Sequence, residues 1–138
     1  RTATATISAP HVRSTRMIGY TTLGTNDLPR AAAFYDELFA VIGIQRLMDF
    51  GRGYAWGTGM DKPAFGVMRP FDGNPASVGN GVMIALAVDS QDKVRALHAK
   101  ALALGGSDEG APGPRGEGFY AAYFRDLDGN KLNAFCVG

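Results

Sequence analysis

Side chains that commonly bind metals or act as nucleophiles are scarce in this sequence. The chain has two histidines, His11 and His98, and one cysteine, Cys136. A catalytic zinc or iron site needs about three protein ligands drawn from imidazole, thiolate and carboxylate groups. Cys136 lies in an apolar predicted strand with no histidine in register, so we interpret it as a core thiol. The only glutamates fall on a predicted helix or in loops: Glu37, Glu109 and Glu117.

Three glycine-containing stretches could be mistaken for ligand-binding loops. Residues 126–130, with the sequence DLDGN, have the start of a calcium loop but lack the later bidentate glutamate of an EF-hand. We interpret them as a hairpin turn. Residues 51–53 and 110–118 contain neither a GxGxxG motif nor a Walker lysine, so we interpret both as loops that do not bind phosphate.

The elements that must position any site belong to one small domain. The 138 residues are 46% hydrophobic and 20% charged, which is typical of a single globular domain and excludes general disorder. No apolar stretch reaches the ~20 residues of a transmembrane helix. A single cysteine cannot form an internal disulfide, and no secretory signal is evident. We therefore expect a cytoplasmic protein.

Charge is distributed unevenly along the chain. An N-terminal arm, residues 1–16, carries three arginines and no acid, whereas residues 17–138 carry 11 basic and 13 acidic residues. A nearly neutral body has no electrostatic footprint for nucleic acid or an anionic membrane, so we expect neither partner. The arm has the composition of a transit peptide, but Met17 also fits a natural start. The arm could lie along a sheet edge or a partner subunit.

An internal repeat dominates the organisation of the chain. Residues 17–43 and 80–106 align without a gap at an offset of 63 residues. Asp27 and Ser90 are aligned and both are good helix N-caps. Apolar residues at three- and four-residue spacing follow each cap and predict two amphipathic helices. Gly43 and Gly106 are aligned at the helix ends, where glycine can adopt the left-handed conformation.

Strand patterns follow each predicted helix. In the first half, residues 44–50, 53–58 and 64–70 are candidate strands, separated by turn residues. In the second half, residues 118–125 and 131–137 are clear candidates, whereas the Gly/Pro-rich residues 107–117 are weak as a strand. Each half therefore predicts a βαβββ unit, in residues 17–71 and 80–138. The connection between the two units is predicted to be a surface crossover.

Five stretches carry a likeness to a known family: LGTNDLPRAAAFYDELFAVIG, FGRGYAWG, GNGVMIALAV, KALALGGSDEGAPGPR and GFYAAYFRDLDGNKLNAFC. Through them the chain resembles the vicinal oxygen chelate superfamily, also called the glyoxalase/bleomycin resistance/dioxygenase family. The likeness covers residues 17–138, which we expect to form a single glyoxalase/bleomycin resistance-like domain. It implies an α+β fold in which two tandem βαβββ units form one open, cup-like mixed β-barrel with helices outside. It also implies a homodimer, because related proteins often complete their cups across a two-fold interface.

The resemblance also locates the positions where metal-dependent relatives keep their ligands. Those relatives place His, Gln or Glu on the first and last strands of each unit. The matching first-strand residues here are Tyr20 and Met83, and the matching last-strand residue of the second unit is Asn133. The corresponding strand of the first unit, residues 65–68, offers no ligand. We therefore expect no bound metal and no other cofactor.

Strand alternation and the resemblance together define a candidate ligand pocket. Tyr20 and Thr22 share one face of a strand and are expected to face the cup. Tyr, Asn, Arg and Thr are too polar to fill a dry core without partners, although the alternative is that the aromatics merely fill a collapsed cup. The ligand-pocket candidates are Tyr20, Thr22, Trp56, Phe65, Arg69, Met83, Tyr120 and Asn133, with Tyr123 as an alternative to Tyr120.

Three functions remain open from the sequence. The first is a metal-free pocket that binds a small aromatic or amphipathic molecule, as bleomycin-type resistance proteins do. The second is a lyase or isomerase of the same superfamily that acts on a small oxygenated substrate, with Tyr20 as acid and Arg69 or Asn133 as oxyanion donor. The third is a filled cup that serves only through its dimer surface. The absence of a base from the predicted cup favours binding.

Overall fold

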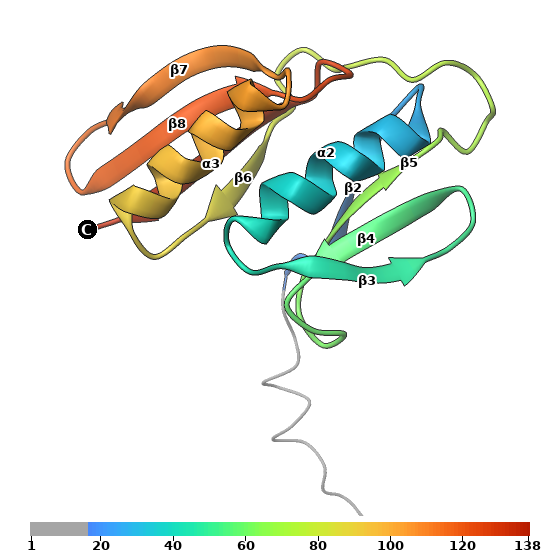
Figure 1. Cartoon of the computed structure of the whole chain (residues 1–138), viewed down its shortest axis with the longest axis horizontal. Coiled ribbons are helices and arrows are strands. Elements are labelled where there is room, and N and C mark those ends of the chain that lie inside the picture. The colour runs from blue at the N-terminus through green and yellow to red at the C-terminus, as the bar shows by residue number, and fades with distance from the viewer. Residues whose placement is uncertain (1–16) are drawn as a thin grey trace, which may run out of the picture.

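The computed structural model describes residues 17–138, so the predictions for the N-terminal arm and His11 lie outside the described residues. Two units follow one another along the chain, and Figure 1 shows them side by side, joined by a long crossover after β5. The elements are β2 (Tyr20–Gly24), α2 (Leu28–Ala40), β3 (Gln45–Asp49), β4 (Gly53–Gly57), β5 (Ala64–Met68), β6 (Ile84–Ala87), α3 (Gln91–Ala103), β7 (Ser107–Pro114), β8 (Phe119–Arg125) and β9 (Lys131–Val137).

The helix starts follow the repeat closely. The side chain of Asp27 accepts a hydrogen bond from the backbone N–H of Arg30 at 3.2 Å, and Ser90 accepts one from Lys93 at 3.2 Å. Each bond satisfies one of the N–H groups that the first helical turn leaves unpaired. Helix α2 is followed by Gly43 in the left-handed region, with φ of 74°.

The end of α3 differs from the expectation. Gly105, with φ of 102°, adopts the left-handed conformation there, one residue before the predicted Gly106. Gly106 is constrained by space instead, because a Cβ atom at this position would lie 2.6 Å from the carbonyl oxygen of Arg125. The helix therefore ends at a left-handed Gly105, and Gly106 permits close packing of the chain against β8.

Each unit folds into a four-stranded mixed sheet of the same topology. The strand orders are β2-β5-β4-β3 and β6-β9-β8-β7, and in each sheet only the first pair is parallel. Thr22 pairs with Gly66 in the first sheet, and Ala85 pairs with Asn133 in the second. The α+β fold of two tandem βαβββ units is thus confirmed. Within the described residues the two sheets stay separate and open rather than closing into a barrel.

The Gly/Pro-rich segment after α3 is a strand after all. β7 covers eight residues and pairs with β8 across two register shifts, which lie between Asp108 and Gly110 and between Gly110 and Gly113. Such bulges bend a strand and tolerate residues that a regular ladder disfavours. The weak strand propensity of residues 107–114 is therefore overridden by pairing with the long neighbouring strand.

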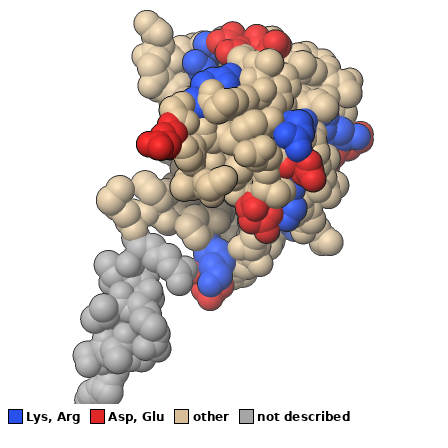
Figure 2. Space-filling model, turned by 90° about the vertical axis from the view of Figure 1, so that its left-hand side faces the viewer, with Lys and Arg blue, Asp and Glu red and all other residues tan. Residues whose placement is uncertain are grey.

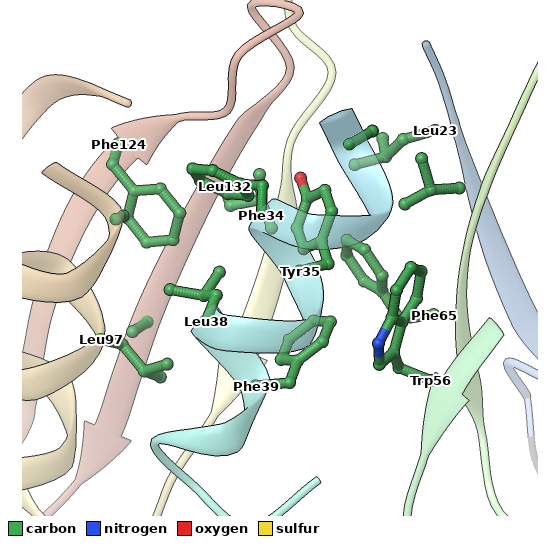
Figure 3. Close-up of a cluster of buried hydrophobic side chains, with 14 of the residues drawn as sticks. Leu23, Phe34, Tyr35, Leu38, Phe39, Trp56, Phe65, Leu97, Phe124 and Leu132 are labelled. Carbon is green, nitrogen blue, oxygen red and sulfur yellow. The ribbon is translucent and has the colours of Figure 1, made fainter. Parts of the chain in front are cut away.

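One hydrophobic core serves both units. Figure 3 shows α2 in the middle of this core, with Leu38 directed toward Leu97 of α3 and Phe39 directed toward Trp56. Side chains from α2, α3 and one face of each sheet belong to the same buried cluster. The helix-facing surfaces of the sheets are therefore buried, and the opposite surface of each sheet lies outside the shared core. We call these opposite surfaces the outer faces.

A buried polar network fixes the β8–β9 turn against the start of α2. Asp126 accepts hydrogen bonds from the backbone N–H groups of Asp128 and Asn130, both at 2.9 Å, and from the hydroxyl of Tyr35 at 2.6 Å. Thr25 donates to Asp128 at 2.6 Å. Residues 126–130 therefore form a structural turn that joins the two units, as the turn interpretation predicted.

Positive and negative side chains are mixed on the face of the molecule that Figure 2 shows, where lysine and arginine lie interspersed with aspartate and glutamate. None of the helices in the described part of the chain is long and apolar enough to span a membrane.

Candidate functional site

The outer face of the first sheet carries a cavity of about 630 Å³. Tyr20 and Thr22 line it because they alternate along β2 with Thr21 and Leu23, which face the helix side. Tyr20 is 74% exposed, so its phenol is accessible. A volume of this size falls in the range of small-molecule pockets, ~300–1,000 Å³. The other prominent lining side chains are Met48, Phe50, Arg52, Met60, Lys62 and Met68.

Trp56 and Phe65 lie on the other side of the same sheet, which corrects the expectation that they share one cup with Tyr20. Trp56 is fully buried, and its indole N–H donates to Asp36 at 2.9 Å. Phe65 packs against Phe39 with ring centroids 5.0 Å apart. Alternation along β4 and β5 places these large rings under α2, where burying apolar area stabilises the fold.

A second cavity, of about 580 Å³, lies between the units and gathers the candidates that face the helix side. Met83, which precedes β6, lines it together with Phe65 and Trp56. Tyr20 and Thr22 are not among its lining residues. Within one chain, the residues predicted to share a pocket are therefore divided between two cavities.

Tyr120 and Arg69 are placed away from both cavities. The hydroxyl of Tyr120 accepts a hydrogen bond from Arg95 of α3 at 3.0 Å, so Tyr120 faces the helix. Arg69 follows the end of β5 and is exposed, and its backbone N–H donates to the carbonyl of Arg52. Neither residue is among those lining the cavities, which corrects their assignment to the pocket.

Asn133 lies on the outer face of the second sheet, opposite Tyr123 of β8. It is only 2% exposed, and its side-chain oxygen is buried without a hydrogen-bond partner in the described structure. An unsatisfied buried acceptor is uncommon and unfavourable. Tyr123, rather than Tyr120, is therefore the β8 tyrosine that shares a face with Asn133.

Cations surround Tyr123 on this outer face. The guanidinium of Arg115 lies 5.5 Å from the centre of its ring, and the ammonium of Lys131 lies 5.6 Å from it. The sequence interpretation missed both residues, as well as Arg52 and Lys62 at the first cavity. Strand alternation could have found Lys131, which lies two residues before Asn133 in β9.

The donor set at the family's metal positions does not fit a divalent metal. Tyr20 and Met83 line different cavities, and Asn133 lies on the other sheet. A phenol, a thioether and a neutral amide are also weak substitutes for imidazole and carboxylate. Within residues 17–138 no group of three or more His, Cys, Asp or Glu side chains could hold an ion. His98 is instead engaged with Asp108, with Nε2 and Oδ1 3.0 Å apart.

Two perturbed ionisable groups belong to the scaffold of the fold. Burial raises the pKa of the Tyr35 phenol well above its ordinary value, and the nearby Asp126 carboxylate raises it further. The pKa of Asp108 is lowered, first by the hydrogen bond from the backbone N–H of Gly110 and then by the contact with His98. Both groups take part in contacts that join elements, Tyr35 with Asp126 and Asp108 with His98, and neither group lines the first cavity.

Comparison with known proteins bears out the family. The chain is similar to a crystal structure of a glyoxalase/bleomycin resistance protein from Albidiferax ferrireducens, with 35% identity over 89% of this chain and all of that one, and a TM-score of 0.82. Two more distant likenesses concern the fold alone. A lactoylglutathione lyase from Agrobacterium tumefaciens is 22% identical over 87% of this chain and 92% of that one, with a TM-score of 0.62. A fosfomycin resistance protein from Listeria monocytogenes is 18% identical over 90% of this chain and 95% of that one, with a TM-score of 0.67.

No curated protein sequence matches the chain. The family model described as the glyoxalase/bleomycin resistance protein/dioxygenase superfamily matches residues 17–134, which is nearly all of the described part. With this match, the paired βαβββ units and the outer-face cavity, the chain belongs to the glyoxalase/bleomycin resistance protein/dioxygenase superfamily.

Proposed function

We propose that this protein binds a small aromatic or amphipathic molecule, without a metal ion, on the outer face of its first sheet. The observation that carries the proposal is the cavity itself, which combines an accessible phenol at Tyr20 with methionine and phenylalanine side chains. An apolar concave surface with a few polar groups is the usual form of a small-molecule site. Methionine adapts its shape to ligands readily, which suits a sequestering protein.

A second copy of the chain is proposed to complete the site. The cavity lies on a single sheet and is open on the side away from that sheet. Its rim carries three exposed apolar side chains, Met48, Phe50 and Met60. The outer face of the second sheet also lies outside the core, with Phe119 and Phe135 stacked 5.2 Å apart. In a two-fold dimer, the second sheet of one protomer can cover the first sheet of its partner, so that each cup contains Tyr20 from one chain and Asn133 from the other.

The second candidate function is a lyase or isomerase that acts on a small oxygenated substrate. The observation that favours it is the unpartnered side-chain oxygen of Asn133, since buried polar groups without partners often mark functional positions. In this alternative, the Tyr20 hydroxyl donates a proton or hydrogen bond to an oxygen of the substrate. No base has been located in the first cavity, whose lining contains no histidine or carboxylate among the described residues. Binding without turnover is therefore the preferred function.

Two measurements on the purified protein test the proposal, an analysis of its metal content and a ligand screen. Elemental analysis is expected to find less than a stoichiometric amount of any divalent metal. A fluorescence or thermal-shift screen of aromatic and amphipathic compounds is then expected to find binders, and NMR should place their contacts at Tyr20, Thr22 and Gly66. Product analysis by mass spectrometry separates the two functions, because only the enzyme converts its ligand. One zinc, iron, manganese or nickel ion per chain, or binders that all sit away from these residues, would refute the proposal.

A further inference from the structure

We infer that the molecule bound in the first cavity is an organic anion, with an apolar or aromatic body and a carboxylate, sulfonate or phosphate group. This inference rests on the proposed function and adds the charge of the ligand to it. Its starting point is the composition of the cavity wall. The wall includes two cationic side chains, Arg52 and Lys62, and no aspartate or glutamate among the described residues.

Arg52 is held in place by neutral groups. Its Nε–H donates to the carbonyl oxygen of Arg69 at 3.1 Å, and Nη2 lies 3.4 Å from the sulfur of Met68. The guanidinium also lies 5.2 Å from the centre of the Phe71 ring. These contacts orient the guanidinium and use only some of its five N–H donors. The remaining donors can form the paired hydrogen bonds that carboxylates and phosphates accept from arginine.

The second sheet carries similar cations on its outer face, and an ion pair there joins Arg125 to Glu109 at 3.2 Å. Arg115 donates to the carbonyl oxygens of Ala111 and Pro114, and both Arg115 and Lys131 lie against the ring of Tyr123. These partners of Arg115 and Lys131 are again neutral groups. Both surfaces proposed to form the cup therefore carry cations held by carbonyl groups, sulfur or aromatic rings.

The charge of these surfaces is a local property, because the whole chain has a net charge of only +1. A positive site in a partly enclosed apolar cavity attracts an anionic ligand and disfavours a cationic one. The aromatic and methionine side chains of the cavity accommodate the apolar body of the same molecule. The geometry thus favours an amphipathic anion over a neutral or cationic compound of equal size.

A matched pair of fluorescent probes tests the inference directly. 8-Anilinonaphthalene-1-sulfonate and N-phenyl-1-naphthylamine share an arylaminonaphthalene body, but only the first carries a negative charge. The sulfonate is expected to bind the full chain at least ~10-fold more tightly, a difference of ~1.4 kcal/mol. Its affinity should fall as salt is raised, because salt screens the exposed cations. NMR shifts at Tyr20, Thr22 and Gly66 should confirm that both probes occupy the first cavity.

Substitutions test whether Arg52 binds the anionic group of the probe. Arg52→Gln is expected to weaken binding of the sulfonate probe by ~5- to 10-fold and to leave the neutral probe unchanged. Lys93→Gln on α3 removes the same charge far along the chain from the cavity and serves as the control, with an expected effect below 2-fold. Arg52→Lys keeps the positive charge, and it should retain most of the preference for the anion. This variant keeps the test open if Arg52→Gln fails to fold.

The possible results separate the inference from the proposed function. Equal or tighter binding of the neutral probe at the first cavity would overturn the inference and leave the small-molecule site standing. An equal loss of affinity in Arg52→Gln and Lys93→Gln would also overturn it, since the preference would then reflect net charge alone. If neither probe perturbs the cavity residues, both the inference and the proposed site are wrong.

Discussion

Tyr20 is the residue on which the proposed site depends most directly. Its phenol is exposed at the wall of the first cavity. Its neighbour Thr22 adds a second hydroxyl on the same face of β2. A hydroxyl can orient a ligand by one hydrogen bond without requiring a cation.

Replacing Tyr20 with phenylalanine is expected to weaken ligand binding and leave folding intact. The lost hydrogen bond should cost ~0.5–1.5 kcal/mol of binding free energy. Isothermal titration with a compound from the screen measures this loss, and the melting temperature should stay unchanged because the side chain is exposed. Tyr120→Phe is the comparison variant, because the Tyr120 hydroxyl faces α3 away from both cavities, and it should leave the affinity unchanged. A Tyr20→Phe protein that binds every compound with unchanged affinity would contradict the role assigned to the hydroxyl.

Asn133 is predicted to limit the stability of the fold. Because its buried side-chain oxygen lacks a partner, Asn133→Leu should raise the free energy of unfolding by ~1 kcal/mol. Asn130→Leu is the matched control, since the Asn130 amide donates to Asp126 and to the carbonyl of Gly24. Its replacement should lower stability by ~1–3 kcal/mol. Urea denaturation distinguishes the two outcomes, and a destabilised Asn133→Leu protein would mean that the amide is satisfied in solution.

At the scale of elements, polar contacts hold helices and strands in register with one another. The turn at residues 126–130 is bonded to Tyr35 of α2, and β7 is bonded to α3 through His98 and Asp108. These contacts are specific where the apolar core is not, because a hydrogen bond fixes direction as well as distance. They lead to two predictions, one for the joint between the units and one for the attachment of β7.

Tyr35→Phe should destabilise the joint between the units. The variant removes the hydroxyl that donates to the buried Asp126 carboxylate at 2.6 Å. Losing a donor to a charged acceptor is expected to cost ~1.5–3 kcal/mol of unfolding free energy. Denaturant unfolding measures the cost, and Tyr123→Phe, whose hydroxyl makes no hydrogen bond within residues 17–138, should change stability by less than ~0.5 kcal/mol. Equal stability of the two variants would show that the network contributes little.

Asp108 should make the attachment of β7 dependent on acid pH. Its pKa is lower in the folded chain than in the unfolded chain, so its stabilising effect is present above the unfolded value and is lost as pH falls through the folded value. Asp108→Asn should therefore melt below the parent protein at pH 7, and the difference should shrink as the pH falls below the ordinary aspartate pKa of ~3.9. Differential scanning calorimetry across this range provides the test. Glu117→Gln, at an exposed loop position, should show no such pH-dependent difference.

At the scale of the whole molecule, the open outer faces lead to the proposed dimer. Each face carries apolar side chains that the shared core does not cover. Exposed apolar surface of this kind is common at protein interfaces. In the proposed dimer, Tyr20 of one protomer and Asn133 of its partner, which lie on different sheets, face the same cup.

Light scattering at micromolar concentration is expected to give the mass of a dimer. Met48→Glu places a charge on the rim of the first cavity and should shift the equilibrium toward the monomer, because an unpaired charge is costly at a buried interface. Val78→Glu in the crossover between the units is the control and should leave the dimer intact. A monomeric parent protein would refute the dimer, and an equal effect of both substitutions would refute this choice of interface.

The sequence by itself determined the repeating architecture. The caps at Asp27 and Ser90, the helical periodicity and the strand patterns are local signals, and each depends on residues close together in the chain. They predicted both βαβββ units, and strand alternation predicted that Tyr20 lies on the face of its strand opposite the helices. Local signals failed at β7, because pairing with β8 outweighed the weak strand propensity of its glycines and prolines.

Only the tertiary structure decided which residues share a cavity. Strand alternation places Tyr54 and Trp56 on one face of β4 and Ala55 on the other. It does not determine which of the two faces the helix covers. Packing of α2 and α3 into one core buried the Trp56 and Phe65 face and left Tyr20 with Arg52 on the other. Burial depends on contacts between residues distant in the sequence, and those contacts exist only once the two units have packed together.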